Sequence, residues 1–260
     1  MASHFDYFYL VEIQYLGFRY HGWQFQHGLK TLQGMLEKTF SFLFKDEKFK
    51  ILGSGRTDAM VSAQSAYFEL FTKSELELEA FKRDLDENLP PDIKVINIKA
   101  VDKQFNVIQD VKLKTYYYFF ASVEEKYPFA APFMNCIHHS LDIQKMKEAA
   151  SLFEGEHEFK YFMVGDAENK NTIREIKESR IEVNNELTAS FFPEESFVFK
   201  VTGKGFMRYQ IRLMMGALIR IGRNEISLQD LGDALQGNHP NFDKLNAAAS
   251  GLMVKNIEFK

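Results

Sequence analysis

Hydrophobic and polar positions alternate near the start of the chain and then recur at helical spacing. Over residues 7–15, apolar Val11 and Ile13 alternate with polar Glu12 and Gln14, a pattern typical of a strand with one buried face. From Leu32 onwards, apolar residues recur three and four positions apart, which predicts an amphipathic helix. Further strands are expected at 49–53, 61–71 and 93–101.

A second helix is expected in the first half of the chain. Ser74 and Glu77 have the spacing of a capping box, and apolar residues follow them at helical intervals up to Leu85. The pair Pro90-Pro91 then ends the helix. The predicted order of this half is strand, helix, strand, strand, helix, strand.

The second half has a similar predicted order. A helix containing Met146 and Phe153 is expected to end at Gly155, and Ser227 with Asp230 is expected to begin a short helix. Its other predicted elements are strands at 112–123, 172–183, 197–202 and 252–259 and a long apolar helix at 206–222.

The repeated order predicts an α+β fold of two ferredoxin-like, or RRM-like, βαββαβ halves. The halves are assigned to residues 1–105 and 106–260. Because no linker rich in proline or serine separates them, they are expected to share one extended antiparallel sheet.

Composition indicates a cytoplasmic protein. Apolar residues make up 45% and charged residues 26%, and no apolar run reaches the length of a membrane span. The first residues lack the basic and apolar regions of a secretory signal. The single cysteine, Cys136, excludes an internal disulfide. Most of the 26 phenylalanines are expected in the core.

Basic residues are concentrated between positions 200 and 223, although the net charge of the chain is −4. Arg208 and Arg212 lie four positions apart, so they are expected on one face of the predicted helix. An arginine in so apolar a helix either needs an anionic partner, such as Asp58 or a phosphate, or extends to the edge of the core. The segment contains no acidic residue between its basic residues Lys200, Lys204, Arg208, Arg212, Arg220 and Arg223.

The loop at 53–59, Gly-Ser-Gly-Arg-Thr-Asp-Ala, is a candidate reactive site. Asp58 either caps its own turn while Arg56 faces solvent, or presents a carboxylate for chemistry. In the second case a nearby guanidinium lowers the pKa of the carboxyl group, and the ionised group acts as nucleophile or general base.

Two aromatic segments have alternative interpretations. Tyr116 and Tyr118 share one face of a predicted strand, where they form either core or a surface for stacking bases. In the loop at 20–26, His21, Trp23 and Gln24 suit nucleotide contacts, but Trp23 equally suits a structural plug. No cluster of carboxylates or cysteines accompanies the histidines at 138–139, so no metal site is expected.

Together these segments resemble the tRNA pseudouridine synthase A family. The Gly-Arg-Thr-Asp segment at 55–58 is the most specific match, and the segments occur in family order over nearly the whole chain. The other matching segments are 20–24, 31–33, 36–37, 88–90 and 92–93, with Tyr116, Tyr118, Phe206, Arg212, Gly216, Gly222, Gly251 and Leu252.

The resemblance implies roles for individual residues. Asp58 matches the catalytic aspartate, Arg212 the arginine paired with it, and Tyr116 the tyrosine that stacks on the target uracil. Arg56 and Leu252 are then expected at the substrate. RNA contacts are expected from Arg208, Lys204, His21, Trp23 and Gln24.

The resemblance also implies a reaction and its partners. Uridine at positions 38–40 of the tRNA anticodon stem-loop would be isomerised to pseudouridine without cofactor or metal. Family members are homodimers whose two halves flank a central cleft, and one tRNA contacts both subunits. A homodimer that binds tRNA and no membrane is therefore expected.

Several positions depart from the family pattern. Met60 replaces a glycine, and Ser62 replaces a histidine. Differences also occur at 106–108, at Thr115 and at Arg208-Tyr209, and several of these changes fall on the side expected to face RNA. These changes predict a divergent member whose choice of tRNA is altered.

Two other functions are consistent with parts of this pattern. An RNA-binding paralogue without turnover would keep the fold and the basic segment but leave Asp58 idle. A metal-dependent phosphoryl-transfer enzyme would need clustered carboxylates, but the next acidic residue after Asp58 is Glu69.

Overall fold

The computed structural model describes residues 5–165 and 171–260, which form two compact units. The first unit combines Met1–Lys112 with Val254–Lys260, and the second is Leu113–Met253. The chain is mixed α/β, and most of its strand pairs are antiparallel.

The first unit has the predicted order strand, helix, strand, strand, helix, strand. Within its sheet, β1 pairs antiparallel with both β3 and β4, and β2 pairs antiparallel with β3. Its elements are β1 (Tyr7–Tyr15), the 3-10 turn η1 (Gly17–Arg19), α1 (Leu32–Phe44), β2 (Lys50–Gly53), β3 (Ser62–Thr72), α2 (Leu78–Asn88) and β4 (Ile93–Ala100).

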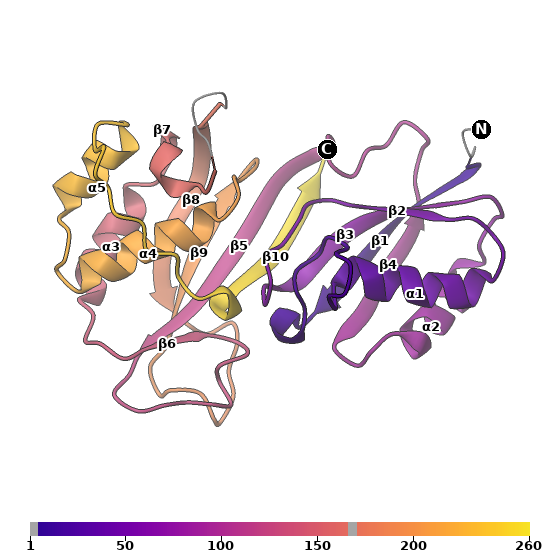
Figure 1. The fold of residues 1–260 in the computed structure, drawn as a ribbon, viewed down its shortest axis with the longest axis horizontal. Helices are drawn as coiled ribbons and strands as arrows, with labels where there is room; N and C mark the ends of the chain where they lie inside the picture. The colour runs from indigo at the N-terminus through magenta and orange to yellow at the C-terminus, as the bar shows by residue number, and fades with distance from the viewer. Residues whose placement is uncertain (1–4, 166–170) are drawn as a thin grey trace. The chain divides into compact units, whose positions relative to one another are not determined.

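Phenylalanine rings join the two helices of this unit to each other and to the sheet. Helices α1 and α2 lie side by side (Figure 1), with the ring of Phe81 stacked on Phe40 and Phe44. Phe40 also contacts Phe68 of β3, at 6.0 Å between ring centroids. Phe40 and Phe68 are buried, whereas Phe44 and Phe81 are half-buried. The expectation that most phenylalanines lie in the core is wrong, because many of them, such as the exposed Phe42 and Phe129, are not buried.

The start of α2 differs from the prediction. Glu77, rather than Ser74, is the N-cap, and its carboxylate accepts a hydrogen bond from the backbone N–H of Ala80. The backbone N–H of Ser74 donates instead to Glu47. The predicted capping box is therefore wrong, because the carboxylate of Glu77 already satisfies the first turn of the helix.

The last strand, β10 (Leu252–Phe259), begins in the second unit and continues into the first. Phe259 packs against Tyr67 and Phe105, and Lys255 donates a hydrogen bond to Gln64. The boundary between the compact units thus lies between residues 112 and 113, and the chain re-enters the first unit at residue 254. The sequence placed the boundary between residues 105 and 106.

In the second unit, β9 pairs antiparallel with both β5 and β8, β7 pairs with β8, and β6 runs parallel to β5. The short strands β6 and β7 were not predicted. The elements are β5 (Val111–Ser122), β6 (Asn135–Ile137), α3 (Ile143–Ser151), β7 (Gly155–Glu158), η2 (Lys160–Phe162), β8 (Ile173–Val183), β9 (Phe197–Gly203), α4 (Gln210–Gly222), α5 (Leu228–Leu235) and η3 (Ala249–Gly251).

Two predicted helix ends in this unit are wrong, and one is confirmed. Helix α4 begins at Gln210 rather than at residue 206, because Tyr209 has a left-handed φ of 64°. Helix α3 ends at Ser151, and Gly155 instead begins β7. The capping box of Ser227 and Asp230 is present at the start of α5.

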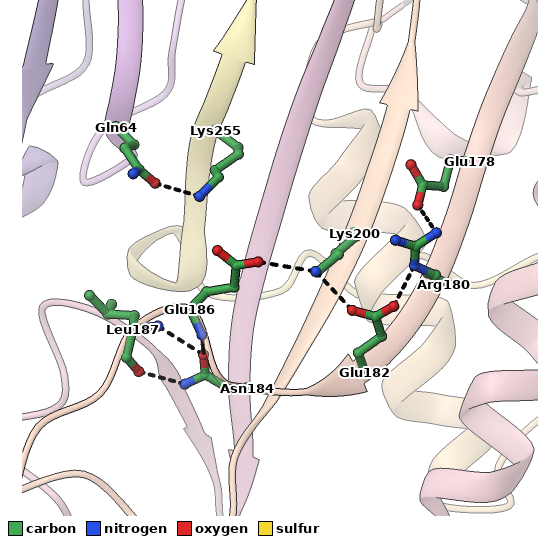
Figure 2. A network of polar contacts seen from close by, with 9 residues as sticks. All are labelled: Gln64, Glu178, Arg180, Glu182, Asn184, Glu186, Leu187, Lys200 and Lys255. Atoms are coloured by element: carbon green, nitrogen blue, oxygen red, sulfur yellow. Dashed lines mark hydrogen bonds and ion pairs between the residues drawn. The ribbon is translucent and has the colours of Figure 1, made fainter.

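Both faces of the aromatic strand β5 are packed. On one face, Phe120 contacts Phe197. On the other, Tyr117 and Phe119 belong to a buried cluster with Val198. Figure 2 shows the ion pairs of β8, β9 and the loop that joins them, in which Lys200 contacts Glu182 and Glu186. The ammonium group of Lys200 also lies 5.0 Å from the ring centre of Tyr117.

Candidate active site

Asp58 lies in the first unit, in the loop between β2 and β3. Its side chain is half-buried, while that of Arg56 is exposed. The hydroxyl groups of Thr57 and Tyr15 are 3.2 Å apart and hydrogen-bonded, which fixes the residue before Asp58 to the end of β1. We refer to residues 54–61 as the aspartate loop.

Residues 20–23 hold the aspartate loop by its backbone on both sides of Asp58. The N–H of Trp23 donates to the carbonyl of Thr57 at 3.1 Å. The N–H of Met60 donates to the carbonyl of Tyr20 at 3.0 Å. The position of the carboxylate therefore depends on a segment that lies far from it in sequence.

Trp23 packs in the core, which was the alternative to contact with RNA. Its side chain is only 4% exposed, and its ring contacts Phe68. A Cβ on Gly53 would come within 2.4 Å of the indole nitrogen, so the ring lies directly against the backbone at the end of β2. Trp23 therefore supports the aspartate loop by packing.

The other two residues of this loop that were expected to contact RNA, His21 and Gln24, are more accessible than Trp23. His21 is exposed, and its backbone N–H donates to the carbonyl of Lys30. Gln24 is half-buried, and its amide donates to the side chain of Gln33 at 2.8 Å. Of the three loop residues, His21 thus has the side chain that solvent reaches most freely.

Met60 has a left-handed backbone with φ of 68°. Residues with a Cβ adopt this region at a cost, whereas glycine adopts it readily. The family's glycine at this position would suit the same backbone. The substitution therefore adds a half-buried side chain in a conformation that favours glycine.

In the second unit, Arg208 and Arg212 both lie against the ring of Tyr209. The guanidinium carbons are 5.0 and 5.1 Å from the ring centre. Arg208 precedes the first residue of α4, so the prediction that the two arginines share a helix face is wrong. The ring of Tyr209 brings them together instead, with Arg208 exposed and Arg212 half-buried.

Arg212 is oriented by the segment that precedes η3. Its Nε donates to the carbonyl of Ala247 at 2.8 Å, and the N–H of Ala247 donates to the carbonyl of Arg212. Asp58 belongs to the first unit and Arg212 to the second. Their pairing stays a prediction.

Tyr118 supports the same segment from β5. Its fully buried hydroxyl donates to the carbonyl of Ala248 at 2.8 Å and accepts a hydrogen bond from Asn135. Burial raises the pKa of the Tyr118 hydroxyl, which therefore stays protonated as a donor. The sequence included Tyr118 in the resemblance but assigned it no role.

The remaining candidates of this unit differ in exposure. Tyr116 is half-buried, and its ring meets Phe206 edge-on at 5.2 Å between centroids. Lys204 is exposed, and its contact with RNA stays a prediction. Leu252 is buried at the start of β10.

Residues 5–165 and 171–260 contain no group of three or more His, Cys, Asp or Glu side chains that could hold a metal ion. Over the same residues, no helix has the length and apolar character needed to cross a membrane.

Comparison with known proteins decides the family. The model of the family described as tRNA pseudouridine synthase matches residues 12–110 and 149–260. The chain belongs to the tRNA pseudouridine synthase family. The matched ranges contain Asp58 and Arg212, whereas Tyr116 lies between them.

Curated relatives of the tRNA pseudouridine synthase family extend over nearly the whole chain. A protein of Dictyoglomus thermophilum named tRNA pseudouridine synthase A is 33% identical, over 96% of this chain and 98% of its own. Its namesake from Thermodesulfovibrio yellowstonii is 30% identical, over 95% and 97%. A tRNA pseudouridine synthase A 2 of Bacillus thuringiensis is 30% identical, over 96% and 99%.

Proposed function

We propose that this protein isomerises uridine to pseudouridine in tRNA and that Asp58 is the catalytic carboxylate. The observation that carries the proposal is the placement of Asp58. It lies in a Gly-Arg-Thr-Asp loop, within a range matched by the family model, and hydrogen bonds fix the backbone on both sides of it. A half-buried carboxylate on a fixed loop suits attack on a bound nucleotide.

The proposed reaction rearranges one nucleotide. The C1′–N1 bond breaks, the uracil turns and a C1′–C5 bond forms. The proton on C5 leaves, and N1 takes up a proton. Asp58 acts either as nucleophile at C1′ or as base at C2′. The target base must leave its stack to be reached, and Tyr116 offers it an aromatic surface.

The other predicted residues have roles around this carboxylate. Arg212 keeps Asp58 ionised, because a nearby cation lowers the pKa of a carboxyl group. Arg56 and Leu252 contact the substrate. Arg208, Lys204, His21 and Gln24 bind the RNA backbone or loop bases, and Trp23 supports the aspartate loop from the core.

We extend the proposal to the whole assembly. Each unit is a ferredoxin-like half; in the first, β1 lies between β3 and β4 as that fold requires. The halves share one sheet and flank a cleft, and two copies of the chain bind one tRNA. The substrate is the anticodon stem-loop, at positions 38–40, and the enzyme acts in the cytoplasm.

The test is tritium release from tRNA labelled at C5 of uracil. Asp58→Asn keeps the shape of the side chain but removes its charge, so we expect the rate to fall by more than about 1,000-fold while tRNA binding persists. Asp102→Asn makes the same change at an exposed position of the same unit and serves as the matched control.

Three outcomes decide between functions. Release by wild type and by Asp102→Asn, but not by Asp58→Asn, supports the proposal. No release from any tRNA pool, with tight binding retained, would instead identify an RNA-binding paralogue without turnover. Loss of both rate and binding in Asp58→Asn would show that Asp58 is structural.

A further inference from the structure

A buried tyrosine and a carboxylate connect the aspartate loop to the start of β4. Tyr20 is 2% exposed, and its hydroxyl donates to Oδ1 of Asp92 at 2.7 Å. Arg19 donates from Nε to Oδ2 of the same carboxylate, also at 2.7 Å. The carboxylate of Asp92 therefore binds two consecutive residues at the end of η1.

The backbone of Asp92 binds the same region. Its carbonyl accepts a hydrogen bond from the N–H of Leu16 at 3.0 Å. Asp92 thus binds Leu16 before η1 through its main chain, and Arg19 at the end of η1 and Tyr20 after it through its side chain. Tyr20 is fixed at its hydroxyl end by a part of the fold that also begins β4.

The opposite end of Tyr20 reaches the aspartate loop. Its carbonyl accepts from the N–H of Met60, two positions after Asp58. A single residue thus spans from the carboxylate of Asp92 to the backbone beside the proposed catalytic group. A shift of Tyr20 would move this hydrogen bond and with it the loop.

The hydrogen bond between the Tyr20 hydroxyl and the Asp92 carboxylate is charge-assisted. Burial acts to raise the pKa of Asp92, but the hydrogen bonds from Arg19 and Tyr20 outweigh it and hold that pKa below its usual value. The carboxylate is therefore ionised at neutral pH, and hydrogen bonds to ionised groups are shorter and stronger than neutral ones.

We propose that Tyr20 and Asp92 are positioning residues, which set the location of Asp58 through the Met60–Tyr20 backbone bond. The inference rests on the proposed catalytic role of Asp58. Catalysis depends on the geometry of attack, and a displacement of about 1 Å can reduce a rate about 100-fold. Loss of the Tyr20 hydroxyl should therefore lower kcat more than it weakens tRNA binding.

The test compares Tyr20→Phe with wild type in the tritium-release assay, well below the melting temperature of both. Tyr20→Phe keeps the buried ring and removes only the hydroxyl. We expect kcat to fall about 10- to 100-fold, with KM and the Kd for tRNA within about threefold of wild type. A purely structural role would lower the melting temperature and leave kcat unchanged.

Tyr9→Phe is the matched control. Tyr9 is 3% exposed in the same unit, and its hydroxyl accepts a hydrogen bond from the N–H of Leu76, away from the aspartate loop. This variant should lose stability comparably but keep the kcat of wild type. An equal fall of kcat in both variants would overturn the proposal.

The double variant tests whether the two residues act together. If Tyr20 and Asp92 act through one bond, Tyr20→Phe combined with Asp92→Asn should be no slower than the slower single variant. Additive losses would overturn the link between them. Wild-type kcat in Tyr20→Phe would overturn the inference alone, whereas no release by wild type would overturn the proposed function and this inference with it.

Discussion

Met60 occupies a backbone conformation that glycine adopts more readily. Methionine stands here where the resemblance expects glycine. The structure has Met60 at φ of 68°, in the region that glycine favours. The N–H of Met60 also donates to Tyr20, and this bond needs the loop to turn as it does.

Substitutions of Met60 should follow the preference of the left-handed region. Met60→Gly relieves the φ penalty but loses side-chain packing, so we expect unfolding free energy within about 1 kcal/mol of wild type and retained activity. Met60→Val adds a β-branched side chain and should cost about 1–3 kcal/mol. Urea unfolding measures both; greater stability of Met60→Val than Met60→Gly would contradict this account.

At this scale the sequence indicated a candidate for the reactive group but not the residues that support it. Asp58 was located because its neighbours form a specific short motif. The contact of Tyr20 with Asp92 spans 72 positions, and nothing in the spacing of either residue indicates the other. The burial of Trp23 was left open, because a tryptophan beside amides suits a core and a nucleotide equally.

Among the elements, those with strong periodicity were predicted closely. β1 and α1 match their predicted ranges because apolar residues recur regularly in both. The start of α4 was placed too early, because the apolar pattern begins at Phe206 whereas the helical backbone begins only at Gln210. A left-handed tyrosine has no signature in the hydrophobic pattern, and the short strands β6 and β7 carry too few residues to show alternation.

Two glycines of α4 should respond differently to alanine. A Cβ on Gly216 would lie 1.6 Å from the carbonyl oxygen of Leu245, so the segment that orients Arg212 would have to move. We expect Gly216→Ala to cost about 1–3 kcal/mol of unfolding free energy. Denaturant unfolding measures this cost.

Gly222 provides the comparison in the same helix. A Cβ there would meet the side chain of Met146, 2.6 Å from its sulfur, and this flexible chain can move aside. Alanine also favours helix by about 1 kcal/mol over glycine. Gly222→Ala should therefore change stability little, and an equal loss in both variants would argue against close packing of the Leu245 segment on α4.

Over the whole molecule, charge is distributed unevenly. The net charge is −4, yet the run from Lys200 to Arg223 contains no acidic residue. Several of its basic groups are already paired within the protein: Lys200 contacts Glu182 and Glu186, and Arg220 contacts Glu225. Exposed Lys204 and Arg208 are thus better placed to contact RNA.

The salt dependence of tRNA binding should report on these groups. Each phosphate contact releases counterions, so Arg208→Ala should weaken binding and reduce the slope of log Kd against log salt by about 1. Arg83→Ala removes an exposed arginine of α2 and should leave the slope unchanged. Equal slopes for wild type and Arg208→Ala would remove Arg208 from the RNA-binding surface.

The path of β10 has a consequence for how the protein is made. The first unit is synthesised first, but residues 254–260 complete it only after the second unit has been made. Until then, β3 lacks its neighbour β10 and presents unpaired backbone groups along that part of its edge. Open strand edges promote aggregation. A chain that stalls before residue 254 therefore exposes an open strand edge in the unit that carries Asp58.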